Sequence, residues 1–127
     1  MNRRTVGDTG VAQALKYFVD HDYIVSIPFT ESAPYDLVVQ TRLGGPLQRV
    51  QCKRGTTFSK SNVPQIELRT SGGNQSWGGV VKTIQPDDTD WVWCSHGESA
   101  WLIPAKDVQG MKILCLGKLR RDRQVLG

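Results

Sequence analysis

The pattern of apolar and polar residues predicts a helix followed by a strand at the start of the chain. Four apolar positions recur at i, i+4, i+7 and i+8, which is one face of a helix: Val11, Leu15, Phe18 and Val19. They predict a helix over about residues 9–20, with Asp8 or Thr9 as its N-cap. Residues 23–27 are rich in β-branched side chains and end at Pro28, so they predict a strand.

The next apolar runs predict a β-hairpin. Residues 36–42 and 47–53 both have strand-like patterns, and the connection between them contains two adjacent glycines that permit a tight reversal. A reversal centred on these glycines sets Asp36 opposite Lys53 and leaves Gln51 on the diagonal. This pairing is an assumption, because a slip of one residue would move Asp36 to the other face of the hairpin.

The rest of the chain predicts a single mixed domain. Further strand-like runs lie at residues 65–70, 91–94, 100–103 and 111–116. The second and third of these flank a turn and predict another hairpin, whereas the glycine-rich residues 71–79 predict a surface loop. One clear helix among several strands favours a single-domain α/β (α+β) fold, with a domain over residues 1–116 and a basic tail over 117–127.

Composition and charge exclude several classes of protein. The chain has 127 residues, of which 39% are hydrophobic, enough for one domain. Residues 1–110 contain equal numbers of basic and acidic side chains, so the net charge of +4 comes from the last seventeen residues. No apolar run approaches the roughly 18–20 residues that cross a bilayer, and no signal sequence is present, so we expect a cytoplasmic protein without a membrane partner.

The cysteines and tryptophans indicate structural roles. The cysteines are odd in number and far apart, which excludes a disulfide framework and a zinc site: Cys52, Cys94 and Cys115. Three tryptophans lie at strand spacing, which favours a place in the core or in a subunit interface over base stacking: Trp91, Trp93 and Trp101.

Polar side chains of the first predicted hairpin form a candidate site. Gln51 and Lys53 are two residues apart and therefore share a face of their strand, which Asp36 joins if the pairing holds. Asp36, the Gln51 amide oxygen and the Cys52 carbonyl are hard oxygen ligands suited to Mg²⁺, with Mn²⁺ as a substitute. Lys53 could orient a metal-bound water or offset charge on a phosphate, which suits phosphodiester hydrolysis. The alternative is a surface hairpin with an ordinary cross-strand ion pair.

These residues resemble a known enzyme family. Residues 34–38, a hairpin, and then residues 50–53 are similar to the core of the PD-(D/E)XK nucleases, with Gln51 in the position usually held by Asp or Glu. The similarity is greatest to the Gln-x-Lys variant of group I intron-associated homing endonucleases and extends over about residues 7–105. It implies that Asp36 is a metal ligand, Gln51 the second motif position and Lys53 the catalytic lysine.

The resemblance also implies an architecture and a substrate. It predicts a restriction-endonuclease-like αβββαβ core with a mixed central sheet and an added C-terminal hairpin. It further implies divalent-metal-dependent cleavage of double-stranded DNA, and assembly into a homodimer or homotetramer. Such a protein would act at the nucleoid and could be encoded by a virus or a mobile element.

The first helix departs from the family pattern. Family members commonly place a Glu where this chain has Val11, and Gln51 is also neutral, so the site contains one certain carboxylate. The chain has only three glutamates, which leaves Asp8 and Glu67 as candidate replacements. Asp8 is explained equally well as an N-cap.

A run without acidic residues predicts the surface that binds DNA. It lies between Leu37 and Ile66, next to the candidate site, although its basic residues could simply be solvated. The predicted DNA contacts come from this run, from the glycine-rich loop and from the tail: Arg42, Arg49, Arg54, Lys60, Asn74, Gln75, Arg120 and Arg121.

Three functions remain open from the sequence. The first is a homing-type or resolvase-like metal-dependent DNA endonuclease. The second is a catalytically weakened or inactive DNA-binding protein that retains the nuclease fold, which Val11 and Gln51 favour. The third is a β-rich module that binds RNA or single strands through its tryptophans.

Overall fold

The computed structural model describes residues 2–70 and 82–127, and its first element is a long helix. Helix α1 spans Arg3–Asp20, and the Asn2 side chain caps it by accepting a hydrogen bond of 2.9 Å from the Thr5 N–H. The predicted cap at Asp8 or Thr9 is therefore wrong, because Asn2 supplies the capping oxygen a full turn or more earlier. Both residues lie inside the helix instead.

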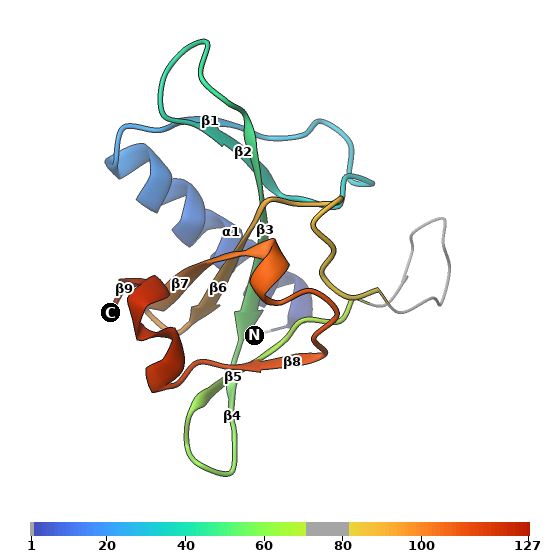
Figure 1. The fold of residues 1–127 in the computed structure, drawn as a ribbon, viewed down its shortest axis with the longest axis vertical. Helices are drawn as coiled ribbons and strands as arrows, with labels where there is room; N and C mark the ends of the chain where they lie inside the picture. The colour runs from blue at the N-terminus through green and yellow to red at the C-terminus, as the bar shows by residue number, and fades with distance from the viewer. Residues whose placement is uncertain (1, 71–81) are drawn as a thin grey trace.

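A mixed six-stranded sheet forms the centre of the molecule (Figure 1). Its spatial order is β1-β2-β3-β6-β7-β9, and only the β3–β6 pair is parallel. The strands are β1 (Ile24–Ser26), β2 (Leu37–Gln40), β3 (Gln48–Gly55), β6 (Trp91–His96), β7 (Ser99–Pro104) and β9 (Gln124–Leu126). The predicted mixed sheet and both predicted hairpins, β2–β3 and β6–β7, are confirmed.

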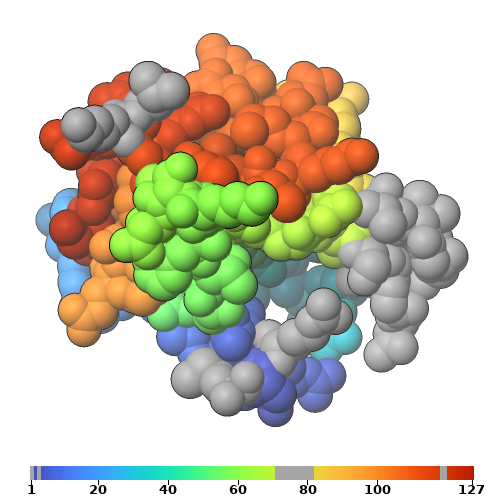
Figure 2. Space-filling view, turned by 90° about the horizontal axis from the view of Figure 1, so that it is seen from below, coloured from blue at the N-terminus to red at the C-terminus, as the bar shows by residue number. Residues whose placement is uncertain are grey.

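A smaller sheet covers part of the face that α1 leaves open. It has the order β4-β5-β8. Two 3-10 helices flank β8 in the chain, η1 before it and η2 after it. These elements are β4 (Thr57–Phe58), β5 (Pro64–Glu67), β8 (Ile113–Cys115), η1 (Ala105–Asp107) and η2 (Lys118–Arg123). Seen in space-filling form, the β4–β5 segment lies against the orange and red C-terminal third of the chain (Figure 2).

Two apolar clusters hold these layers together, one on each face of the central sheet. Ala14 and Phe18 of α1 pack with Leu37, Val50 and Trp93 on one face. On the other face, a second cluster joins the central sheet to the small sheet and η1: Ile66, Leu68, Ile84, Val92, Cys94, Trp101, Ile103, Ala105, Val108, Leu114 and Leu116. The alternation of side chains along β6 and β7 explains why both clusters draw on the same strands.

The tryptophans occupy the core, as their spacing predicts. Trp93 is fully buried on the α1 face and Trp101 is buried on the opposite face, while Trp91 is half-buried. The indole of Trp93 also donates a hydrogen bond of 3.2 Å to the Gln13 side chain on α1. The burial of Trp93 and Trp101 removes these two side chains from the surface and so argues against base stacking by them.

The register of the β2–β3 hairpin differs from the symmetric expectation. Leu37 pairs with Val50 and Val39 with Gln48, so continuing the register sets Asp36 level with Gln51 and not with Lys53. The reversal is centred earlier than expected, because the Gly45 N–H donates to the Arg42 carbonyl at 3.0 Å and Gly44 supplies the positive φ. The correction amounts to two residues, which preserves the face on which each side chain lies.

The C-terminal segment does not end the fold as the sequence suggested. The predicted strand over residues 111–116 is β8, but it is not the last strand. After it the chain forms η2 and then β9, which pairs antiparallel with β7. Val125 and Leu126 pack against the α1-face cluster, so the basic segment returns to the central sheet.

The described residues contain one α-helix, so the second helix of an αβββαβ order is not among them. The predicted glycine-rich loop, with Asn74 and Gln75, lies outside the described residues. In the part of the chain that is described, no helix is long and apolar enough to cross a membrane.

Candidate active site

The structure brings Asp36, Gln51 and Lys53 together in one cavity of about 360 Å³. The cavity lies where β2 begins and the middle of β3 passes, so that β3 supplies two side chains and the residue before β2 supplies the third. Thr70 and Lys82, which flank the segment outside the described residues, line the same cavity. The predicted convergence on one face therefore holds despite the corrected register.

Asp36 is held in place by the backbone of β3. Its Oδ2 accepts a hydrogen bond of 2.7 Å from the Cys52 N–H, and its own N–H donates to the Val50 carbonyl at 2.9 Å. Burial raises the pKa of the Asp36 carboxyl, while the Cys52 hydrogen bond and the nearby Lys53 charge oppose the rise. The group is thus a fixed, poorly solvated carboxylate at the cavity wall.

The oxygen atoms around Asp36 fit a hard divalent cation. A residue in a strand directs its N–H and C=O to the same side, so the Cys52 carbonyl faces the edge where Asp36 accepts the Cys52 N–H. The Gln51 side chain lines the cavity and makes no hydrogen bond within the described residues. One carboxylate, one amide oxygen and one carbonyl suit Mg²⁺, which keeps several waters. Residues 2–70 and 82–127 contain no group of three or more His, Cys, Asp or Glu side chains placed to hold a metal ion.

Lys53 points its ammonium group at a hydroxyl. Its Nζ donates to Thr70 Oγ1, and within the described residues it forms no ion pair with Asp36. Burial lowers the pKa of Lys53, and the charges of Asp36 and Glu67 partly offset that effect. Lys53 therefore supplies a cation at the cavity without blocking the Asp36 carboxylate.

A second cavity, of about 450 Å³, connects α1 to the same carboxylate. It is lined by Val11 and Asp8 from α1 and by Asp36, so the residue at the expected Glu position does lie on the site. Glu31, which the sequence analysis missed, lines both cavities together with Asp36. The feature that points to Glu31 in the sequence is its position in the polar loop between β1 and β2, five residues before Asp36.

Glu67, the other candidate carboxylate, is already paired. Its side chain forms an ion pair with Arg69 on the exposed side of β5. The Arg69 hydrogen bond lowers the pKa of Glu67, and the side chain does not line the cavity that holds Asp36. Of the two predicted replacements, Asp8 shares a cavity with Asp36.

The basic residues of the acid-free run are spread over the molecule. Arg42 lies in the β2–β3 connection and Lys60 in the β4–β5 connection, which occupy opposite ends of the long axis (Figure 1). Arg54 lies on the α1 face, where it donates to Ser95 Oγ at 3.3 Å and to the Gly97 carbonyl at 2.9 Å. Because β3 runs along the molecule, a continuous run in sequence does not form one continuous patch.

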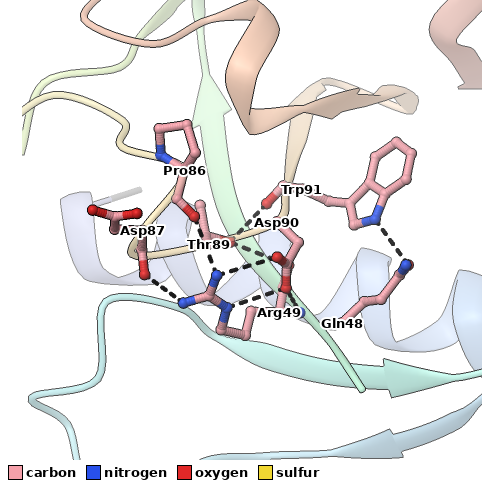
Figure 3. A network of polar contacts seen from close by, with 7 residues as sticks. All are labelled: Gln48, Arg49, Pro86, Asp87, Thr89, Asp90 and Trp91. Atoms are coloured by element: carbon pink, nitrogen blue, oxygen red, sulfur yellow. Dashed lines mark hydrogen bonds and ion pairs between the residues drawn. The ribbon is translucent and has the colours of Figure 1, made fainter. Parts of the chain in front are cut away.

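Arg49 is engaged within the protein (Figure 3). Its Nε donates to Asp90 Oδ2 at 3.1 Å and its Nη2 to Asp90 Oδ1 at 3.1 Å, a bidentate pair. The guanidinium also donates to the carbonyls of Pro86 and Asp87. This network fastens the start of β3 to the turn before β6 and leaves Arg49 few donors for a phosphate.

The two remaining predicted contacts lie on η2. Arg120 is half-buried and its N–H donates to the Gly117 carbonyl at 3.0 Å, whereas Arg121 is exposed. Neither residue lines the cavity of Asp36. Their contact with DNA stays a prediction.

Comparison with known proteins identifies the family. A family model described as PD-(D/E)XK endonuclease matches residues 1–124, so the chain belongs to the PD-(D/E)XK endonuclease family. Among solved structures, the chain is similar to the bacterial homing endonuclease I-Ssp6803I, with a TM-score of 0.77 and 19% identity over 93% of this chain and 80% of that one. At this identity the likeness shows the fold. No curated protein matches the chain.

These findings confirm the resemblance read from the sequence. The mixed α+β fold and the membership of an endonuclease family agree with the expectation from residues 34–38 and 50–53. The protein is accordingly an endonuclease, and its motif residues surround one cavity.

Proposed function

We propose that the protein is a divalent-metal-dependent endonuclease that hydrolyses phosphodiester bonds in duplex DNA, of homing or resolvase-like type. The observation that carries this proposal is the convergence of Asp36, Gln51 and Lys53 in one cavity of a PD-(D/E)XK fold. Each of the three side chains has the chemistry that phosphoryl transfer needs at that place.

The metal-binding role falls to the oxygen atoms near Asp36. Asp36, Gln51 and the carbonyl of Cys52 would hold Mg²⁺, or Mn²⁺ in its place. A bound divalent ion would lower the pKa of a coordinated water and offset charge on the phosphate. With one carboxylate in the set, we expect weak metal binding.

Lys53 would act on the phosphate within the same cavity. An ammonium has three donors, and Thr70 Oγ1 accepts from one of them. The remaining donors are available to a non-bridging phosphate oxygen or to the attacking water. Since the group is shielded from solvent, its charge stabilises the developing negative charge more strongly than it would in water.

We also propose an assembly and a setting for the enzyme. A subunit of 127 residues offers little surface for a long recognition site, so we propose that it acts as a homodimer or homotetramer. We further propose that it acts at the nucleoid in the cytoplasm, where duplex DNA, its proposed substrate, is found.

The direct test measures cleavage of plasmid and linear duplex DNA over a range of Mg²⁺ and Mn²⁺ concentrations. Wild type is expected to cut, and Asp36→Ala and Lys53→Ala to lose activity. Lys106→Ala, an exposed lysine of η1 outside the cavity, is the matched control and should cut like wild type. Calorimetry should show Mg²⁺ binding to wild type and not to Asp36→Ala. Equal cutting by wild type and both site variants contradicts the proposal.

A second candidate is a DNA-binding protein that retains the fold and has lost cleavage. The neutral residues Val11 and Gln51, which leave Asp36 as the one carboxylate of the motif, favour it. This protein would bind duplex DNA with a steep salt dependence and would not cut at any metal concentration.

A further inference from the structure

The Lys53 ammonium has one hydrogen-bond partner in the described structure, the hydroxyl of Thr70. Lys53 lies on β3 of the central sheet, whereas Thr70 lies three residues after the end of β5, in an isolated bridge with Lys82. Both residues are half-buried and line the cavity that contains Asp36. A lysine side chain has many rotamers, and an acceptor at its tip selects among them.

Thr70 is itself fixed by its backbone. Its N–H donates to the Lys82 carbonyl at 2.8 Å, and its carbonyl accepts from the Lys82 N–H at 2.8 Å, which forms an isolated antiparallel bridge. Two residues earlier, the Leu68 N–H donates to the Lys112 carbonyl at 2.9 Å, and the Leu68 side chain is fully buried. The backbone that carries the Thr70 hydroxyl is therefore fixed by hydrogen bonds at Thr70 itself and at Leu68.

We infer that Thr70 is a positioning residue for Lys53, holding its ammonium toward the cavity and away from the Asp36 carboxylate. This inference rests on the proposed function, in which Lys53 acts on the phosphate. The carboxylate of Asp36 lines the same cavity and its charge raises the pKa of Lys53, so it is an alternative partner for the half-buried ammonium. An Asp36–Lys53 ion pair would occupy both the metal ligand and the phosphate donor, and the Thr70 hydroxyl prevents it.

The bridge also brings a second lysine to the site. Lys82 lies directly across from Thr70 and lines the same cavity as Lys53 and Asp36. The backbone geometry that positions the Thr70 hydroxyl thus also places Lys82 beside the cavity.

Two substitutions separate the hydroxyl from the shape of the side chain. Thr70→Val keeps the branched shape and removes the acceptor, whereas Thr70→Ser keeps the acceptor. In single-turnover cleavage, with saturating enzyme in excess over DNA, Thr70→Val is expected to lower the rate constant by about 10-fold to 100-fold. Its dissociation constant for duplex DNA without metal should stay that of wild type, and Thr70→Ser should cut close to the wild-type rate.

A spectroscopic measurement follows the contact independently of cleavage. In protein labelled with ¹³C at lysine Cε, the Lys53 signal is identified by its absence from Lys53→Ala. Thr70→Val should shift this signal, and Thr70→Ser should leave it near its wild-type position. Thermal unfolding of all variants establishes that each is folded.

The outcomes distinguish this inference from the proposed function. If Lys53→Ala cuts like wild type, the proposed function fails, while the lysine signal still decides whether the contact exists. If Lys53→Ala loses activity but Thr70→Val cuts at the wild-type rate, only the positioning role is overturned. The same holds if Thr70→Ser is as slow as Thr70→Val, since packing and not the hydroxyl would then matter.

Discussion

The carboxylate of Asp36, the residue before β2, accepts a hydrogen bond of 2.7 Å from the backbone N–H of Cys52 on β3. This hydrogen bond fixes the orientation of a carboxylate that is largely shielded from solvent. Burial of the charged group is unfavourable and raises the pKa of Asp36. The ionised carboxylate therefore lowers the free energy of unfolding while it stays in a fixed position.

Asp36→Asn is expected to unfold with a larger free energy than wild type at pH 7 without metal. Because the folded pKa of Asp36 lies above its usual value of 3.8, the favourable contribution of the neutral carboxyl is present below that value and is lost as the pH rises through the folded pKa. Asparagine stays neutral and can still accept the Cys52 N–H. The advantage should therefore vanish below pH 3.8 in urea titrations.

Asp36→Ala is the matched control for the hydrogen bond. It also removes the charge but leaves the Cys52 N–H without its acceptor, which costs about 1–3 kcal/mol for a buried group. We expect it to be less stable than Asp36→Asn at every pH. Equal stability of the two variants would contradict the importance of the Cys52 contact.

The pair of Arg49 and Asp90 predicts the opposite pH dependence. Arg49 lowers the pKa of Asp90, so the pair stabilises the fold above the usual value of 3.8 and this contribution is lost as the pH falls through the folded pKa. Since the side chains are 31% and 39% exposed, solvent screening limits the loss in Asp90→Asn to about 1 kcal/mol at pH 7. Asp87→Asn, which keeps the carbonyl that Arg49 uses, should leave the free energy of unfolding unchanged.

Two glycines should respond to alanine with opposite signs. A Cβ at Gly55 would lie 2.3 Å from the Gln65 carbonyl oxygen, where the end of β3 passes β5, so Gly55→Ala should destabilise the protein by about 2 kcal/mol or more. A Cβ at Gly7 on α1 meets nothing within 4 Å, and Gly7→Ala should stabilise by about 0.5–1 kcal/mol through helix propensity. Chemical denaturation measures both, and a loss of stability in Gly7→Ala would show that α1 begins later than described.

Val11→Glu should strengthen the metal site. Val11 lines a cavity with Asp36, so a carboxylate there would add a charged ligand at the point where the family pattern has one. We expect Mg²⁺ to bind at least about tenfold more tightly, which corresponds to about 1.4 kcal/mol, and DNA cleavage to increase. Calorimetry and cleavage assays measure these effects.

Val19→Glu adds the same charge to α1 at an exposed position that does not line the cavity. It should leave the affinity for Mg²⁺ unchanged. If both variants bind Mg²⁺ equally, the effect is one of overall charge and the assignment of Val11 to the site is wrong.

Much of the candidate site could be predicted from the sequence because strand periodicity is local. Gln51 and Lys53 share a face whatever the partner strand does, and Asp36 stays on that face for any even shift of register. The two-residue error in the hairpin therefore left the convergence intact. The helix start was less predictable, because the capping Asn2 lies outside the apolar period from which the helix was inferred.

By itself, the sequence determined the family motif, the two hairpins and the burial of Trp93 and Trp101, all of which depend on residues close together in the chain. Only the tertiary structure decided the partners that lie far apart in sequence. The structure pairs Arg49 with Asp90 and brings Thr70 into contact with Lys53. It also places Arg42 and Lys60 far apart, in the connections β2–β3 and β4–β5. Such contacts depend on how layers pack across the sheet, and side-chain periodicity carries no information about that packing.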